Sequence, residues 1–127
     1  MKESVEYAIE KFEHGFMRLK EGVLSAEDEL EKDGVIQRYE FTFELLWKAL
    51  KIFLEYQGIE VKTPRESLKE GFRINLLDED EIYLDMLEDR NITSHVYDQE
   101  TAEDIFERIK TDYLQAMEKV LNKLKES

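Results

Sequence analysis

A nearly complete lack of proline is the feature that most restricts the folds open to this chain. Its 127 residues contain a single proline, Pro64. Because proline breaks helices and is excluded from central strands, the stretches on either side can form long uninterrupted elements. These stretches are rich in Glu, Lys and Leu and have few β-branched runs, which favours helix over strand. The sequence therefore predicts an all-α protein.

Apolar residues recur at three- and four-residue spacing, the period of one helix face. The spacing predicts a first helix over about residues 3–24 and a second over about residues 35–56. The polar stretch 25–34 is expected to be a connector with room for a helical turn. Gly58 suits the left-handed residue that commonly ends a helix, and it is expected to close the second one.

The region around Pro64 carries the signature of a helix start. Thr63 is a suitable N-cap, Pro64 fits the first helical position, and Glu66 completes a capping box. A short third helix is therefore expected to end near Arg73.

Two further helices complete the predicted architecture. Asp78 is expected to open the fourth, and the last follows Asp98 or Gln99 as its cap. We predict a single domain over residues 1–127, an antiparallel up-and-down four-helix bundle with a short extra helix.

Charge and composition exclude several classes of protein. No apolar run is long enough to span a bilayer, and the first residues lack the apolar core of a signal peptide. Cysteine is absent, which excludes disulfides and thiolate sites. We expect a cytoplasmic protein without membrane contact. The net charge of −13 weighs against loose binding to nucleic acid, although it allows a small basic pocket.

The segment from Arg90 to Asp98 holds the densest set of reactive side chains. On a helical wheel that starts at Ile82, Arg90 and Tyr97 fall within about 10° of the centre of the apolar stripe. His95 falls about 150° from that centre. A straight helix cannot aim Arg90 and His95 at one ligand, so we expect a helix break around residues 93–94 or a second subunit.

These residue types suit metal-independent RNA cleavage. Arg90 would bind a phosphate, and His95 would transfer a proton to or from a ribose or leaving oxygen. Asn91 and Ser94 would orient the phosphate. A purely structural interpretation also stands: Arg90 pairs with Glu40 or Glu44, His95 caps a helix, and Asp98 is an N-cap.

Three stretches carry a family resemblance. Arg90-x4-His95 resembles the signature of the HEPN superfamily, and residues 90–98 resemble its branch of nucleotidyltransferase substrate-binding proteins. Residues 39–48 and 63–66 agree with that branch.

The resemblance implies a helical-bundle homodimer that acts beside a separately encoded minimal nucleotidyltransferase, often as a toxin–antitoxin pair. It implies endoribonuclease activity of Arg90 and His95 on RNA, and modification of Tyr97 with AMP by the partner. The alternative implied by this branch is a non-catalytic subunit that binds a nucleotide or other substrate for the partner.

The remaining candidates are charged groups outside this segment. Arg65 and Lys69 belong to a basic stripe that could hold RNA phosphates or a nucleotide, and a solvated surface is the competing interpretation. Glu44 is expected to support the site through an internal ion pair with a residue such as Arg90 or Arg38, and Asp98 is a second supporting candidate. We expect neither a metal nor a cofactor.

Overall fold

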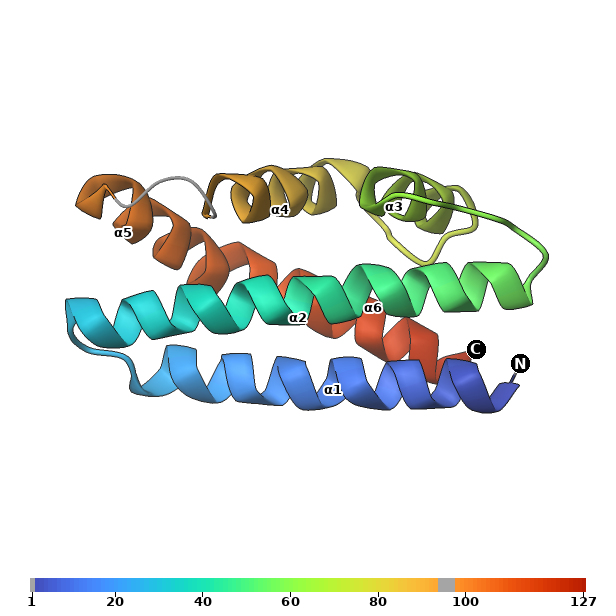
Figure 1. The fold of residues 1–127 in the computed structure, drawn as a ribbon, viewed down its shortest axis with the longest axis horizontal. Helices are drawn as coiled ribbons and strands as arrows, with labels where there is room; N and C mark the ends of the chain where they lie inside the picture. Colours follow the sequence, from blue (N-terminus) through green and yellow to red (C-terminus); the bar gives the residue numbers. More distant parts are fainter. Residues whose placement is uncertain (1, 94–97) are drawn as a thin grey trace.

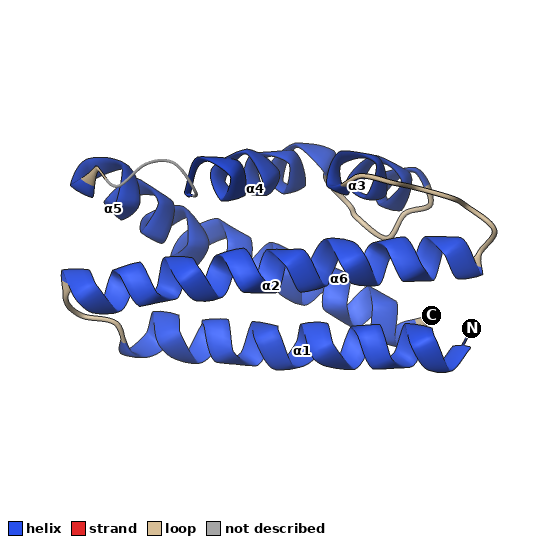
Figure 2. Ribbon diagram, viewed as in Figure 1, coloured by secondary structure: helices blue, strands red, loops and turns tan. Residues whose placement is uncertain are grey.

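The structure, a computed structural model, describes residues 2–93 and 98–127. Every element in these two ranges is helical, which confirms the predicted all-α class (Figure 2). The elements are α1 (Lys2–Ser25), α2 (Glu29–Tyr56), α3 (Pro64–Arg73), α4 (Asp80–Thr93), α5 (Gln99–Arg108), the π-helix η1 (Ile109–Tyr113) and α6 (Leu114–Glu126). The last three join into one continuous C-terminal rod.

The helices form the expected up-and-down bundle. α1 and α2 lie antiparallel along their full length, α4 returns in the direction of α1, and the C-terminal rod crosses the bundle obliquely (Figure 1). The short α3 lies beside the start of α4. Both termini therefore meet at the same end of the molecule. No helix in the described ranges is long and apolar enough to cross a membrane.

The start of α2 differs from the prediction. The helix begins at Glu29, inside the stretch expected to be a connector. Asp28 accepts a hydrogen bond from the Glu31 amide at 2.8 Å, and the Glu31 carboxylate accepts one from the Asp28 amide at 3.2 Å. This reciprocal capping box stabilises a first turn that buries little apolar surface.

The predicted signals around α3 are confirmed except for one hydrogen bond. Gly58 closes α2 with a φ of 86°, and Thr63 caps α3 by accepting from the Glu66 amide at 3.1 Å. The Glu66 carboxylate, however, accepts from the Thr63 hydroxyl, so the capping box is incomplete.

The C-terminal rod contains a π-helical turn that is not among the elements predicted from the sequence. Its inward residues recur at a constant spacing of four: Ile105, Ile109, Tyr113, Met117 and Leu121. In an α-helix each such step exceeds a full turn by about 40°, so the apolar stripe would drift away from the core. The wider turn at η1, in which the Leu114 amide donates to the Ile109 carbonyl, offsets this drift. All five side chains consequently remain buried.

Candidate functional site

Arg90 and Glu44 meet where α4 packs against α2. Arg90 lies in the last turn of α4, and its Nη2 forms an ion pair with Oε1 of Glu44 near the middle of α2. Each side chain keeps 30% of its surface exposed. Glu44 is thus one of the two partners expected for Arg90. The pair is partly exposed, whereas the helical wheel places Arg90 near the centre of the apolar stripe.

Two neighbouring side chains fix the orientation of this ion pair. The second carboxylate oxygen of Glu44 accepts a hydrogen bond from the Trp47 indole at 3.0 Å. On the other side, Nη1 of Arg90 donates to the Asn91 amide oxygen at 3.1 Å. Trp47 is not among the residues predicted for the site. Its spacing of three from Glu44, which places both on one helix face, was the available signal.

An open surface pocket adjoins the ion pair. It is lined by Gln37, Glu40, Phe41, Glu44, Arg90 and Asn91. A guanidinium carries five N–H donors, so the two contacts of Arg90 leave donors for a ligand in the pocket. Phe41, on the same side of the pocket as Glu44 in α2, is 61% exposed. The pocket therefore combines an oriented cation with an apolar ring.

Three candidate residues, Ser94, His95 and Tyr97, lie outside the described residues. The flanking helices still bear on the predicted geometry, since α4 reaches Thr93 and α5 begins at Gln99. The two helices run in opposite directions (Figure 1). α4 and α5 are therefore two separate helices, and the predicted break near residues 93–94 falls at the limit of the described residues.

Asp98 serves as the N-cap of α5. Its carboxylate accepts from the Thr101 hydroxyl at 2.6 Å and from the Glu100 amide at 3.2 Å. The hydrogen bond from the Thr101 hydroxyl lowers the pKa of Asp98 most, and the hydrogen bond from the Glu100 amide lowers it further. The predicted cap is confirmed, and the side chain has a structural task at the end of the segment that holds His95.

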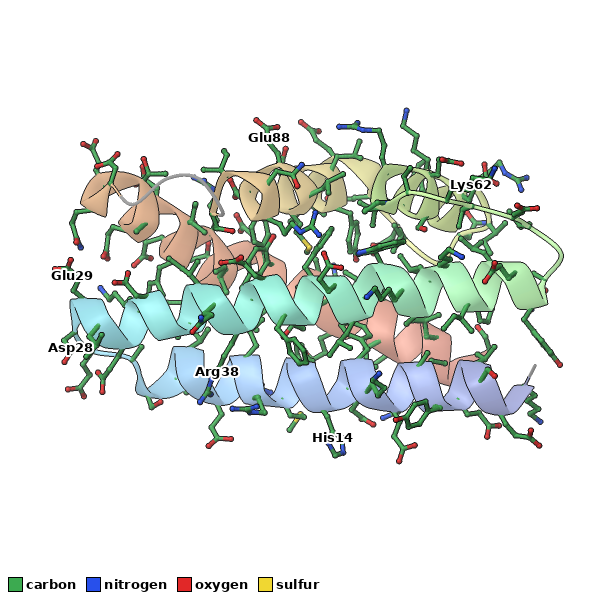
Figure 3. The ribbon with its side chains drawn as sticks, viewed as in Figure 1. His14, Asp28, Glu29, Arg38, Lys62 and Glu88 are labelled. Carbon is green, nitrogen blue, oxygen red and sulfur yellow. The ribbon has the colours of Figure 1, made fainter. Side chains whose placement is uncertain are left out.

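The basic stripe lies apart from Arg90. Arg65 and Lys69 are exposed on α3, which lies beside the opposite end of α4 (Figure 1). Within the described ranges neither forms an ion pair, whereas Arg73 pairs with Glu70 at 2.7 Å. The structure thus does not bring Arg65 and Lys69 into the pocket beside Arg90. Lys62, just before α3, lies in the same region (Figure 3).

A second polar cluster, which the sequence does not predict, is centred on the residue that precedes Arg90. The buried carboxylate of Asp89 accepts from Arg108 Nε at 2.8 Å, Arg108 Nη2 at 2.9 Å and the Tyr113 hydroxyl at 2.5 Å. Burial, and then the hydrogen bond to Asp89, raise the pKa of Tyr113. Three donors therefore compensate the buried charge of a residue that directly precedes Arg90.

No group of three or more acidic or histidine side chains in the described ranges could hold a metal ion. The described histidine, His14, is exposed on α1 and points away from the bundle (Figure 3).

The chain is similar to proteins of two bacteria. The Haemophilus influenzae protein named probable ribonuclease HepT is 33% identical over 81 residues, which span 60% of this chain and 56% of that relative. The matched region is thus little more than half of this curated relative.

Two solved structures share the fold. A crystal structure of a Thermus thermophilus protein matches with a TM-score of 0.83 at 37% identity, over 90% of this chain and 98% of that one. A Haemophilus influenzae structure, described as the fold of a substrate binding domain of a nucleotidyltransferase, matches with a TM-score of 0.83 at 26% identity, over 92% and 98%.

A family model agrees with these likenesses. The family described as nucleotidyltransferase substrate binding protein like matches residues 3–126, nearly the whole chain. The chain belongs to this family of nucleotidyltransferase substrate binding proteins.

Proposed function

We propose that this protein is an endoribonuclease that cleaves RNA without a metal ion, as the partner subunit of a separately encoded nucleotidyltransferase. In this proposal Arg90 binds the scissile phosphate and His95 transfers a proton. The observation that carries the proposal is the guanidinium of Arg90, held at an open pocket with N–H donors to spare. The likeness to the protein named probable ribonuclease HepT supports it.

The proposed reaction uses the ribose 2′-oxygen as the nucleophile. This oxygen attacks phosphorus and loses its proton, while the bond from phosphorus to the 5′-oxygen breaks and that oxygen gains a proton. His95 supplies one of these two proton transfers and water supplies the other. The products are a 2′,3′-cyclic phosphate and a 5′-hydroxyl.

Arg90 has the task of stabilising the negative charge that develops on the non-bridging phosphate oxygens. Its planar fork matches two of those oxygens, and a donor held in place beforehand avoids reorganisation during the reaction. Glu44 and Trp47 support that orientation from α2. Asn91 contacts the guanidinium from α4 and would orient the same phosphate, together with Ser94.

The test is cleavage of a labelled single-stranded RNA in the presence of EDTA. The wild-type protein should cleave, while Arg90→Ala and His95→Ala should lose the activity. Arg38→Ala is the matched control, because Arg38 is a half-buried arginine of α2 that donates to the Arg18 carbonyl at 2.7 Å, away from the pocket. Cleavage that persists in Arg90→Ala, or that vanishes in Arg38→Ala as well, contradicts the proposal.

A second candidate function is substrate binding without cleavage. The description of the family and that of the Haemophilus influenzae structure favour it. The pocket at Arg90, or the basic stripe of Arg65 and Lys69, would then hold a nucleotide for the nucleotidyltransferase. If the protein leaves RNA intact but accelerates nucleotide transfer by its partner, this second function replaces the first. A minimal nucleotidyltransferase in the neighbouring reading frame is expected in both cases.

We further propose a homodimer and a modification by the partner. Sedimentation equilibrium should give twice the mass of the chain. Incubation with the nucleotidyltransferase and ATP should transfer AMP to the Tyr97 hydroxyl oxygen with release of pyrophosphate, as measured by intact mass. Tyr97→Phe should block the transfer. The mass of a monomer contradicts the homodimer. A Tyr97→Phe protein that gains the mass of AMP as the wild type does contradicts the modification of Tyr97.

A further inference from the structure

The cluster of Asp89, Arg108 and Tyr113 joins α4 to the C-terminal rod at the residue that precedes Arg90. The Asp89 side chain is 8% exposed and occupied by three donors, all of which come from the rod. Because successive residues of a helix differ in direction by about 100°, fixing Asp89 also fixes the direction in which Arg90 leaves α4. The two residues are joined by a peptide bond, so the constraint is transmitted without intermediates.

The π-helical turn makes this cluster possible. Arg108 immediately precedes η1 and Tyr113 is its last residue. In an α-helix, side chains five residues apart would point about 140° away from one another. The wider turn brings both side chains to one carboxylate. Such turns are rare and frequently occur at functional sites.

The same cluster also contacts α2, which supplies the other half of the site. The ring of Tyr39 stacks on that of Tyr113 with centroids 5.6 Å apart and an interplanar angle of 19°. The Tyr39 hydroxyl donates to the Met86 carbonyl of α4 at 2.6 Å. α2 and α4, which carry Glu44 and Arg90 respectively, are therefore fixed relative to each other by buried polar contacts about one turn away from the ion pair.

We propose that Asp89, Arg108 and Tyr113 are positioning residues that set the orientation of Arg90 toward its ligand. This assignment rests on the proposed function of Arg90 but adds a separate set of residues to it. None of the three lines the pocket beside Arg90. Their effect is exerted through the last turn of α4.

A matched pair of variants separates positioning from stability. Tyr113→Phe removes the hydroxyl that donates to Asp89 and keeps the ring that stacks on Tyr39. Tyr83→Phe removes an equally buried hydroxyl, which donates at 2.7 Å to the Ala116 carbonyl and also joins α4 to the C-terminal rod. Tyr83 lies seven residues before Arg90, about two turns away. The two variants should lose similar stability, but only the first disturbs the turn that carries Arg90.

The first measurement is steady-state cleavage of RNA in EDTA. We expect kcat to fall about tenfold in Tyr113→Phe with little change in KM, because a misplaced group costs the reaction more than it costs binding. The kcat of Tyr83→Phe should stay within about twofold of wild type. In protein that already carries Arg90→Ala, adding Tyr113→Phe should not lower kcat further. Equal kcat values in the two tyrosine variants would overturn the assignment.

The second measurement does not depend on activity. In ¹⁵N-labelled protein, the side-chain Nε–H resonance of Arg90, identified by its loss in Arg90→Lys, should shift in Tyr113→Phe and not in Tyr83→Phe. Arg108→Lys provides a second perturbation at a half-exposed residue if Tyr113→Phe fails to fold. A shifted resonance in a protein that never cleaves RNA refutes the proposed function alone. An unshifted resonance together with an unaffected kcat refutes the positioning role alone.

Discussion

Asp89 and Arg90 are neighbours in sequence, yet they form ion pairs of two different kinds. Asp89 is buried and its carboxylate accepts from Arg108 and Tyr113, so its charge is fully compensated. Arg90 is 30% exposed, pairs with Glu44 and retains donors toward a pocket. A charged group whose hydrogen-bonding capacity is fully used by protein partners serves the structure, whereas one that keeps unused donors can bind a ligand. One helical turn therefore carries both a structural charge and a charge that is open to a ligand.

The largest expected effect is a loss of stability on substitution of the buried residue, Asp89. Asp89→Ala leaves the Tyr113 hydroxyl and the Arg108 guanidinium without their acceptor. We expect the free energy of unfolding to fall by about 3 kcal/mol, the low end for a broken buried pair because Arg108 remains 42% exposed. Urea denaturation measures the change. A loss smaller than that of the control Asp85→Ala, at an exposed residue of α4, would show that the buried pair contributes nothing.

The opposite result is expected at the exposed member. Arg90→Ala should lower RNA cleavage by about 100-fold or more, the usual cost of removing one donor to developing charge. Its free energy of unfolding should fall by clearly less than in Asp89→Ala, since both side chains of this pair are 30% exposed whereas Asp89 is buried. The two quantities are measured on the same preparation. A large loss of stability in Arg90→Ala would erase the distinction between the two residues.

A smaller effect should follow from loosening the support of Arg90. Trp47→Phe keeps an aromatic ring but removes the N–H that donates to Glu44. We expect a loss of about 1 kcal/mol in stability, the net value of one hydrogen bond. Cleavage should fall severalfold, less than in Arg90→Ala. Lys48→Ala, at the exposed neighbouring position, is the control, and a cleavage rate equal to this control would remove Trp47 from the site.

The smallest effect is expected far from both residues. Thr63→Ala removes the side-chain cap of α3 and should lower the free energy of unfolding by about 1 kcal/mol. Cleavage of RNA should stay unchanged, because α3 lies beside the opposite end of α4. A cap substitution that lowers cleavage as much as Trp47→Phe would mean that any loss of stability impairs the site.

The sequence predicts most of the fold because a buried helix face requires apolar residues at three- and four-residue spacing. The spacing of apolar residues gives α1 and most of α2, and the capping residues give the starts of α3 and α5. The first turns of α2 show no such spacing, since Leu30 is 79% exposed and the helix starts with the capping box of Asp28. A helix end held by hydrogen bonds alone is easily taken for a connector.

Residues of the site can be predicted only where a charged side chain occupies a position that the helical spacing assigns to the core. Arg90 continues an apolar stripe, and that conflict predicts a partner such as Glu44. Asp89 causes no such conflict, because α4 is rich in acids and the pattern does not distinguish Asp89 from Glu88, which points away from the bundle (Figure 3). Its burial depends on Arg108, 19 residues later, and on a π-helical turn that brings Arg108 and Tyr113 together.

The most direct test of the account is the chemical nature of the RNA ends that the protein produces in EDTA. If the 2′-oxygen attacks phosphorus and Arg90 stabilises the developing charge, wild-type protein should produce 2′,3′-cyclic phosphate ends and make no cut beside a 2′-deoxy position. Arg90→Ala should produce these ends about 100-fold more slowly. Ends that carry a 5′-phosphate, or cyclic ends formed by Arg90→Ala at the wild-type rate, would contradict the role assigned to Arg90.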